Sequence, residues 1–136
     1  MIKEIHIIND INQLVRVNEE MTQLANQLGL SEKMCMSLKL ALEEAVTNVI
    51  LYAYPGEKNK EITIRFEIAG DLLKIIITDT GLPFDPTQKE MPDLTLPIQE
   101  RPIGGLGIHL VREIMTDVDY IRKGDKNVLT MLKSIH

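Results

Sequence analysis

The sequence has few aromatic residues, and it lacks the features of a disulfide scaffold or a membrane protein. Its 136 residues include no Trp, two Phe and three Tyr, so the core must be mainly aliphatic. The single cysteine, Cys35, excludes an internal disulfide. No apolar run approaches the roughly 18 residues of a membrane span, and Glu4 stands where a secretory signal needs an apolar residue. We therefore expect a cytoplasmic protein.

Clusters of basic residues and of metal-ligating residues are also missing. The net charge is −5 and Lys and Arg are scattered, which argues against nucleic acid or an anionic membrane as a partner. The three His residues have no zinc-ligand spacing with Cys35. The apolar share of 44% and the charged share of 26% are typical of a folded globular chain. We expect a single domain over residues 1–136.

Hydrophobic periodicity predicts alternating strands and helices along most of the chain. The expected elements, in order, are a strand (2–8), a helix ended by Gly29, a helix capped by Ser31 and ended by Pro55-Gly56, a hairpin around Gly70-Asp71 (62–69 and 72–77), a helix (104–115) and two strands (118–122 and 128–135). This order predicts an α+β, two-layer sandwich. Its mixed, mostly antiparallel sheet would carry three helices on one face, with the uniformly apolar strand 72–77 at the centre.

Prolines concentrate in one segment between the hairpin and the last helix. Five of the six lie between Pro83 and Pro102, which excludes a regular helix or an inner strand there. An irregular stretch of this length in a compact domain is usually a functional lid or a disordered segment. We predict a lid over about residues 85–103.

Glu44 and Asn48 are the first residues that could carry chemistry. They lie four positions apart on the second predicted helix and so share a face. An Asn amide oxygen is a suitable ligand for Mg²⁺, and a carboxylate one turn earlier could act as a general base. A solvated polar stripe on a surface helix would show the same pair, so the spacing alone does not decide.

Two glycine-containing motifs follow. Asp79-Thr80-Gly81 ends an apolar strand, where the Asp could accept a hydrogen bond in a half-buried cleft, for example from the amino group of adenine, or could simply form a turn. Gly104-Gly105-Leu106-Gly107 precedes a helix, whose free N–H groups can bind phosphate. It is neither a Walker motif nor the dinucleotide fingerprint, and a plain hinge fits it equally well.

The order of these motifs resembles the GHKL (Bergerat) ATP-binding fold, and within it the anti-sigma-factor serine-protein kinases of bacterial partner switching. The segment from Ala41 to Asn48 resembles the N box of that family, Asp79 to Pro86 the G1 box and Gly104 to Val111 the G2 box. Pro83 stands where many GHKL proteins have a second G1 glycine, a change that many members of this subgroup share.

The resemblance implies ATP and Mg²⁺ as ligands and assigns roles to individual residues. Asn48 would hold Mg²⁺, and Glu44 would be the base for a substrate serine. Asp79 with Gly81 would bind adenine, with Thr130 nearby, while Gly104, Gly105, Leu106 and Gly107 would cover the phosphates. The roles of Arg101 and His109 stay open.

The resemblance also implies a function. The domain would be an anti-sigma factor and a protein serine/threonine kinase that phosphorylates a small anti-sigma-factor antagonist, with a sigma factor as second partner and a homodimer as the expected assembly. The alternative is a non-catalytic nucleotide-binding module that switches a protein partner. A histidine kinase is disfavoured, because the chain has no long helical hairpin with a phosphorylatable His.

Overall fold

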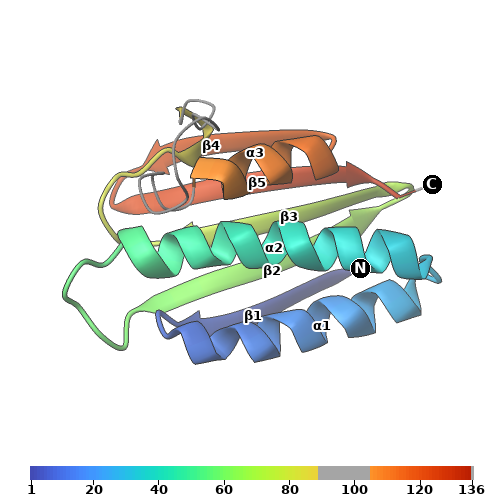
Figure 1. Cartoon of the computed structure of the whole chain (residues 1–136), viewed down its shortest axis with the longest axis horizontal. Helices are drawn as coiled ribbons and strands as arrows, with labels where there is room; N and C mark the ends of the chain where they lie inside the picture. Colours follow the sequence, from blue (N-terminus) through green and yellow to red (C-terminus); the bar gives the residue numbers. More distant parts are fainter. Residues whose placement is uncertain (89–104, 136) are drawn as a thin grey trace.

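The computed structural model describes residues 1–88 and 105–135 (Figure 1). The elements are β1 (Ile2–Ile8), the 3₁₀-helix η1 (Ile11–Gln13), α1 (Leu14–Gln27), α2 (Glu32–Tyr52), β2 (Glu61–Ala69), β3 (Leu72–Asp79), the 3₁₀-helix η2 (Pro86–Gln88), α3 (Gly105–Ile114), β4 (Asp117–Lys123) and β5 (Lys126–Ser134). The predicted order of strands and helices is confirmed. None of the described helices is long and apolar enough to cross a bilayer.

The strands form one sheet in the order β1-β2-β3-β5-β4, with β3 at its centre as expected. Every pairing among the described strands is antiparallel, so the prediction of a mixed sheet is corrected. The reason lies in the connections. The β2–β3 and β4–β5 pairs are hairpins, and α1 and α2 run back and forth so that β2 returns antiparallel to β1 (Figure 1).

The described α-helices, α1, α2 and α3, cover the same face of the sheet and enclose the core (Figure 1). Along β2, β3 and β5, residues alternate between the two faces, and most of those that face the helices are buried. The largest fully buried side chains are aliphatic apart from Phe66, in agreement with the predicted core: Met21, Leu24, Leu38, Leu42, Ile62, Ile64, Leu73, Ile75, Ile77, Ile108 and Met131.

Local signals set the boundaries of several elements. The Ser31 hydroxyl accepts a hydrogen bond from the Met34 amide at 3.1 Å and so caps α2, as predicted. Gly70 and Asp71 form the two-residue turn between the paired residues Ala69 and Leu72. Gly70 has a φ of 59°, a conformation that favours glycine.

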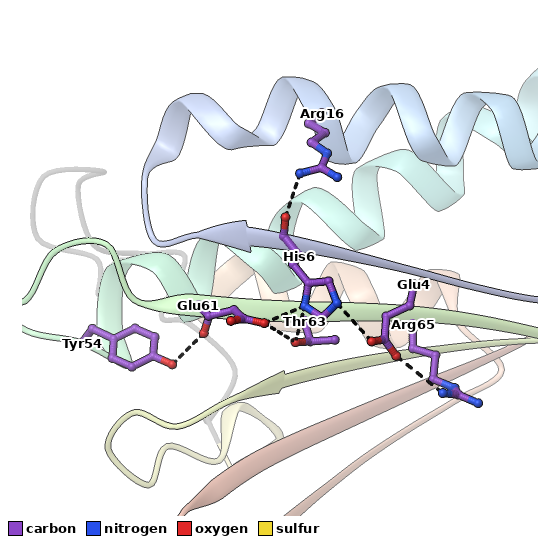
Figure 2. Close-up of polar contacts among 7 residues, drawn as sticks. All are labelled: Glu4, His6, Arg16, Tyr54, Glu61, Thr63 and Arg65. Atoms are coloured by element: carbon purple, nitrogen blue, oxygen red, sulfur yellow. Dashed lines mark hydrogen bonds and ion pairs between the residues drawn. The ribbon is translucent and has the colours of Figure 1, made fainter.

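The uncovered face of the sheet carries a polar network across β1 and β2 (Figure 2). His6 Nδ1 lies 2.6 Å from Glu61 Oε1, and His6 Nε2 lies 3.2 Å from Glu4 Oε1. Arg65 Nη1 lies 3.5 Å from the other oxygen of Glu4. Exposed pairs of this kind contribute little to stability, about 0–1 kcal/mol each. The described residues contain no group of three or more His, Cys, Asp or Glu that could hold a metal.

Most of the predicted lid lies outside the described residues, as do Arg101 and Gly104. In its described part, Pro86–Gln88 forms a single 3₁₀ turn. Asp85 Oδ1 accepts hydrogen bonds from the Thr87 amide at 2.9 Å and the Thr87 hydroxyl at 2.5 Å. Arg112 of α3 also donates to the Thr87 carbonyl, which ties this turn to the last helix.

Candidate functional site

A pocket lies between the second half of α2 and the ends of β3 and β5. The space between its walls, open solvent at the mouth included, is about 370 Å³, of which about 20 Å³ can hold the centre of a water molecule. The lining residues are Ala45, Asn48, Val49, Ala53, Ile77, Asp79, Phe84, Pro86, Tyr120, Asn127 and Leu129. Its walls are therefore mostly apolar, as is usual for a small-molecule site.

The polar residues of this pocket distinguish it from the rest of the fold. Within residues 1–88 and 105–135, the buried polar or charged residues are Asn48, Asp79 and Asn127, each 4% exposed, and all three line the pocket. Burying a polar group costs free energy unless it is hydrogen-bonded, so globular cores seldom hold such groups without a reason. Their concentration at one place marks it as the candidate site.

Asp79, the last residue of β3, presents one carboxylate oxygen to the protein. Its Oδ1 accepts hydrogen bonds from the Gly81 amide at 2.9 Å and from Asn127 Nδ2 at 2.8 Å. Among the described residues, no hydrogen bond goes to Oδ2. Burial raises the pKa of Asp79, and the bonds from Asn127 and Gly81 and the nearby Arg122 charge partly offset this. With respect to residues 1–88 and 105–135, Asp79 therefore has an oxygen acceptor left for a ligand.

The loop after Asp79 is clamped to the end of α2. The Thr80 amide donates to the Tyr54 hydroxyl at 2.8 Å, and the Leu82 amide donates to the Ala53 carbonyl at 2.8 Å. A Cβ added to Gly81 would lie 2.2 Å from the Ala53 carbonyl oxygen, so the close approach requires glycine here. The loop thus holds Asp79 at a defined distance from α2.

We expect Gly81→Ala to destabilise the fold by about 1–3 kcal/mol, because the added methyl group must displace rigid backbone. Thermal unfolding measures the loss, and nucleotide binding should weaken along with it. Gly70→Ala is the control: its Cβ would meet nothing within 4 Å, so only the strain of its φ of 59° remains and the pocket is untouched. A Gly81→Ala protein with unchanged stability and binding would contradict the close approach.

Asn127 is the site residue that sequence reasoning missed. It pairs with Asp79 across β3 and β5 and donates a hydrogen bond to it, whereas Thr130 pairs with Ile76 and Asp119. Thr130 lies between two buried residues of β5 and so faces away from the pocket. We therefore replace Thr130 by Asn127 in the candidate site. Strand alternation could have identified Asn127 from the sequence, because it places this polar residue on the same strand face as the apolar Leu129 and Met131.

Asn48 projects from α2 into the same pocket. Its Nδ2 is buried and has no hydrogen-bond partner among the described residues. A buried amide left unpaired costs about 1–3 kcal/mol, so Nδ2 is a donor available to a group outside residues 1–88 and 105–135, such as a ligand. The neighbouring carboxamide oxygen is a ligand type that Mg²⁺ accepts, so this side chain fits a site beside a hydrated cation.

Glu44 lies one turn earlier on α2, outside the pocket lining. A Cβ added to Gly107 would lie 2.4 Å from Glu44 Oε2, so the carboxylate packs against the first turn of α3. Burial, followed by the charge of Glu43, raises the pKa of Glu44. A carboxylate with a raised pKa is a stronger base than one in water.

The predicted glycine motif lies at the start of α3. Gly105 begins the helix, Leu106 follows within it, and Gly107 is buried. His109 Nε2 is buried and, within the described residues, has no partner. The structure thus brings Asn48 and Asp79 to one pocket. Gly81 does not line this pocket but donates to Asp79 Oδ1, and Glu44 packs against the described part of the motif at the start of α3.

Comparisons with known proteins agree on the family. A family model described as a histidine kinase-like ATPase domain matches residues 7–133. The serine-protein kinase RsbW of Listeria monocytogenes serovar 1/2a is 33% identical over 112 residues, which cover 79% of this chain and 71% of that protein. RsbW of Bacillus subtilis is 35% identical over 101 residues, which cover 70% of this chain and 62% of that protein.

Solved structures with this fold include the RsbU and RsbW domains of a Mycobacterium tuberculosis protein, at a TM-score of 0.68 and 14% identity. The match covers 98% of this chain and 32% of that one. The histidine kinase AdeS of Acinetobacter baumannii matches at a TM-score of 0.54 and 16% identity, over 97% of this chain and 68% of that one. This chain therefore spans about a third of the first of these structures.

The chain belongs to the histidine kinase-like ATPase domain family, and the two relatives named above are serine-protein kinases of the RsbW type. The predicted resemblance and the predicted α+β fold are confirmed. The predicted enzyme class, an ATP-dependent serine-protein kinase, agrees with these relatives.

Proposed function

We propose that this domain binds Mg-ATP in the pocket of Asn48, Asp79 and Asn127 and phosphorylates a serine of a small antagonist protein. The same domain would sequester a sigma factor in the cytoplasm and release it when the unphosphorylated antagonist competes. The observation that carries the proposal is the convergence of the buried polar side chains of the described chain on one apolar pocket.

The pocket chemistry suits an adenine base. Ile77, Leu129 and Val49 offer apolar surface to a flat ring, and Asp79 Oδ2 offers an acceptor to its exocyclic amino group. A base with a carbonyl at that position, such as guanine, would set oxygen against oxygen. The proposed site therefore discriminates between nucleobases by whether one exocyclic group of the base donates or accepts a hydrogen bond.

The phosphates and the metal would lie beyond the base, toward α3. Asn48 would hold Mg²⁺ through its amide oxygen, and the free N–H groups at the start of α3 would bind phosphate. Bound Mg²⁺ would neutralise charge on the phosphates during transfer. Glu44, whose burial raises its pKa, would accept the proton of the attacking serine hydroxyl.

A non-catalytic switch is the second candidate. It is favoured by the position of Glu44, which packs against Gly107 rather than lining the pocket. The two functions differ in one measurable step. Incubation with γ-labelled ATP and the cognate antagonist should label the antagonist on serine if the domain is a kinase. Binding of ATP without any transfer would favour the switch.

Asp79→Asn should weaken Mg-ATP and Mg-ADP binding alike, by about 10- to 100-fold, because the base contact does not involve the γ-phosphate. The Asn oxygen can keep both bonds that Oδ1 makes, to Gly81 and Asn127, while its NH₂ replaces the acceptor at Oδ2. The fold should therefore survive, and the preference for ATP over GTP should narrow. Isothermal titration with the three nucleotides measures these effects.

The control for this substitution is Asp119→Asn, an exposed carboxylate on β4 that leaves the pocket unchanged. It should bind all three nucleotides as the wild type does. If Asp79→Asn discriminated between ATP and ADP, or bound ATP normally, the assignment of Asp79 to the base would be wrong.

A further inference from the structure

Arg122, on the edge strand β4, reaches toward the site although it does not line the pocket. Its Nη1 donates hydrogen bonds to the Gly81 carbonyl at 2.7 Å and to Asn127 Oδ1 at 3.1 Å. Its Nε lies 3.2 Å from the Gly124 carbonyl oxygen, within the turn between β4 and β5. The guanidinium thus connects the Asp79 loop to the residue that contacts Asp79.

The side-chain amide of Asn127 is held in one orientation by partners on both sides. Its Nδ2 donates to Asp79 Oδ1 at 2.8 Å and to the Leu82 carbonyl at 2.7 Å. Its Oδ1 accepts from Arg122 Nη1 and from the Tyr120 hydroxyl. A flipped amide would set its NH₂ against the guanidinium, which has no acceptor, and its oxygen against two oxygens.

The orientation of Asn127 determines what Asp79 can offer a ligand. With Nδ2 and the Gly81 amide both bonded to Oδ1, the carboxylate rotates little and its second oxygen remains an acceptor in the pocket. Arg122 restrains the Gly81 carbonyl as well, so the backbone that supplies one of these donors is held by the same side chain. The half-buried bonds of Arg122 and the buried bond between Asn127 and Asp79 form one network, and networks of this kind rigidify a site.

We propose that Arg122, assisted by Tyr120, is a positioning residue for the nucleobase, because it orients Asn127 and Gly81 so that Asp79 presents only an acceptor. The inference rests on the proposed ATP site and deepens it. It assigns the selection of a base with an exocyclic amino group to a pair of residues on β4, in addition to Asp79 itself. An Arg that served only as a surface charge would affect neither base choice nor affinity.

The test compares three variants with the wild type for binding of Mg-ATP, Mg-ADP and Mg-GTP, by competition against a fluorescent ADP analogue. Arg122→Met should weaken ATP and ADP binding alike, by about 5- to 10-fold, with a smaller effect on GTP, so that the ATP preference narrows. Arg122→Lys should recover part of the loss, since an ammonium group can donate to one of the two acceptors but lacks the fork geometry. Tyr120→Phe should give a smaller loss in the same direction.

Arg65→Met is the matched control, because Arg65 lies on the uncovered sheet face beside Glu4 (Figure 2). It also bonds Glu67 at 2.9 Å and is not among the residues that line the pocket. This variant should leave the three affinities unchanged. Equal losses for ATP and GTP in Arg122→Met, accompanied by a lower melting temperature, would reduce Arg122 to a structural role and overturn the proposal. Unchanged affinities would overturn it as well. A wild-type chain that binds no ATP would instead refute the proposed function on which the inference rests.

Discussion

Asn48→Ala should lose Mg-dependent ATP binding, by more than about 100-fold, while the fold remains intact. The loss of a direct metal ligand should exceed the 10- to 100-fold cost of removing an outer-shell partner. The stability should hold because Asn48 Nδ2 makes no hydrogen bond within the described part of the chain, so little bonding is lost on truncation. Isothermal titration with Mg-ATP, and with ATP in the presence of a chelator, separates the metal-dependent part from the rest.

The matched control is Asn26→Ala, an exposed Asn near the end of α1. It should bind Mg-ATP as the wild type does. Both variants should melt close to the wild-type temperature. Unchanged Mg-ATP affinity in Asn48→Ala would show that the orphaned amide serves something other than the metal site.

Glu44→Gln should slow phosphoryl transfer by about 10²–10⁴-fold and leave nucleotide affinity nearly unchanged. The affinity should hold because Glu44 does not line the pocket and its carboxylate packs against Gly107 instead. The rate should fall because Gln cannot accept the proton of the serine hydroxyl. Phosphoryl transfer has a loose transition state, so positioning could account for part of the effect. Single-turnover phosphorylation of the antagonist and titration with Mg-ATP together measure both quantities.

Two further variants sharpen the Glu44 result. Glu19→Gln removes an exposed carboxylate from α1 and should change neither rate nor affinity. Gly107→Ala keeps the Glu44 carboxylate but displaces it, since the new Cβ would lie 2.4 Å from Oε2, and should also slow transfer. Equal losses of rate and affinity in Glu44→Gln would indicate a structural role, and full activity would remove Glu44 from the mechanism.

Local sequence signals predicted most of the fold. The Ser31 cap, the Gly70-Asp71 turn and the alternating strand 62–69 are encoded by neighbouring residues, and each appears in the structure as expected. The prediction of a mixed sheet was wrong because strand direction depends on the connections as a whole. Because two helices connect β1 to β2, the chain reverses direction between these strands and β2 runs antiparallel to β1. This direction depends on the number of elements between the strands, and no single motif encodes it.

The candidate site was harder to predict, because its geometry comes from contacts between distant residues. Thr130 and Asn127 lie on the same strand, and a slip of one position in strand phase moves a side chain to the other face of the sheet. Arg122 and Tyr54 gave no sequence signal, since their bonds to Gly81 and Thr80 join segments far apart in the chain. Gly104, with its predicted phosphate contact, and Arg101, whose role the sequence left open, both lie outside the described residues.

The most direct test of the account is a crystal structure of this chain with Mg-ADP bound. The account predicts that the exocyclic amino nitrogen of adenine lies about 2.8–3.2 Å from Asp79 Oδ2, with Asn127 and Gly81 still bonded to Oδ1 and the phosphates directed toward the start of α3. A nucleotide bound elsewhere on the domain, or one with its phosphates facing Asp79, would contradict it.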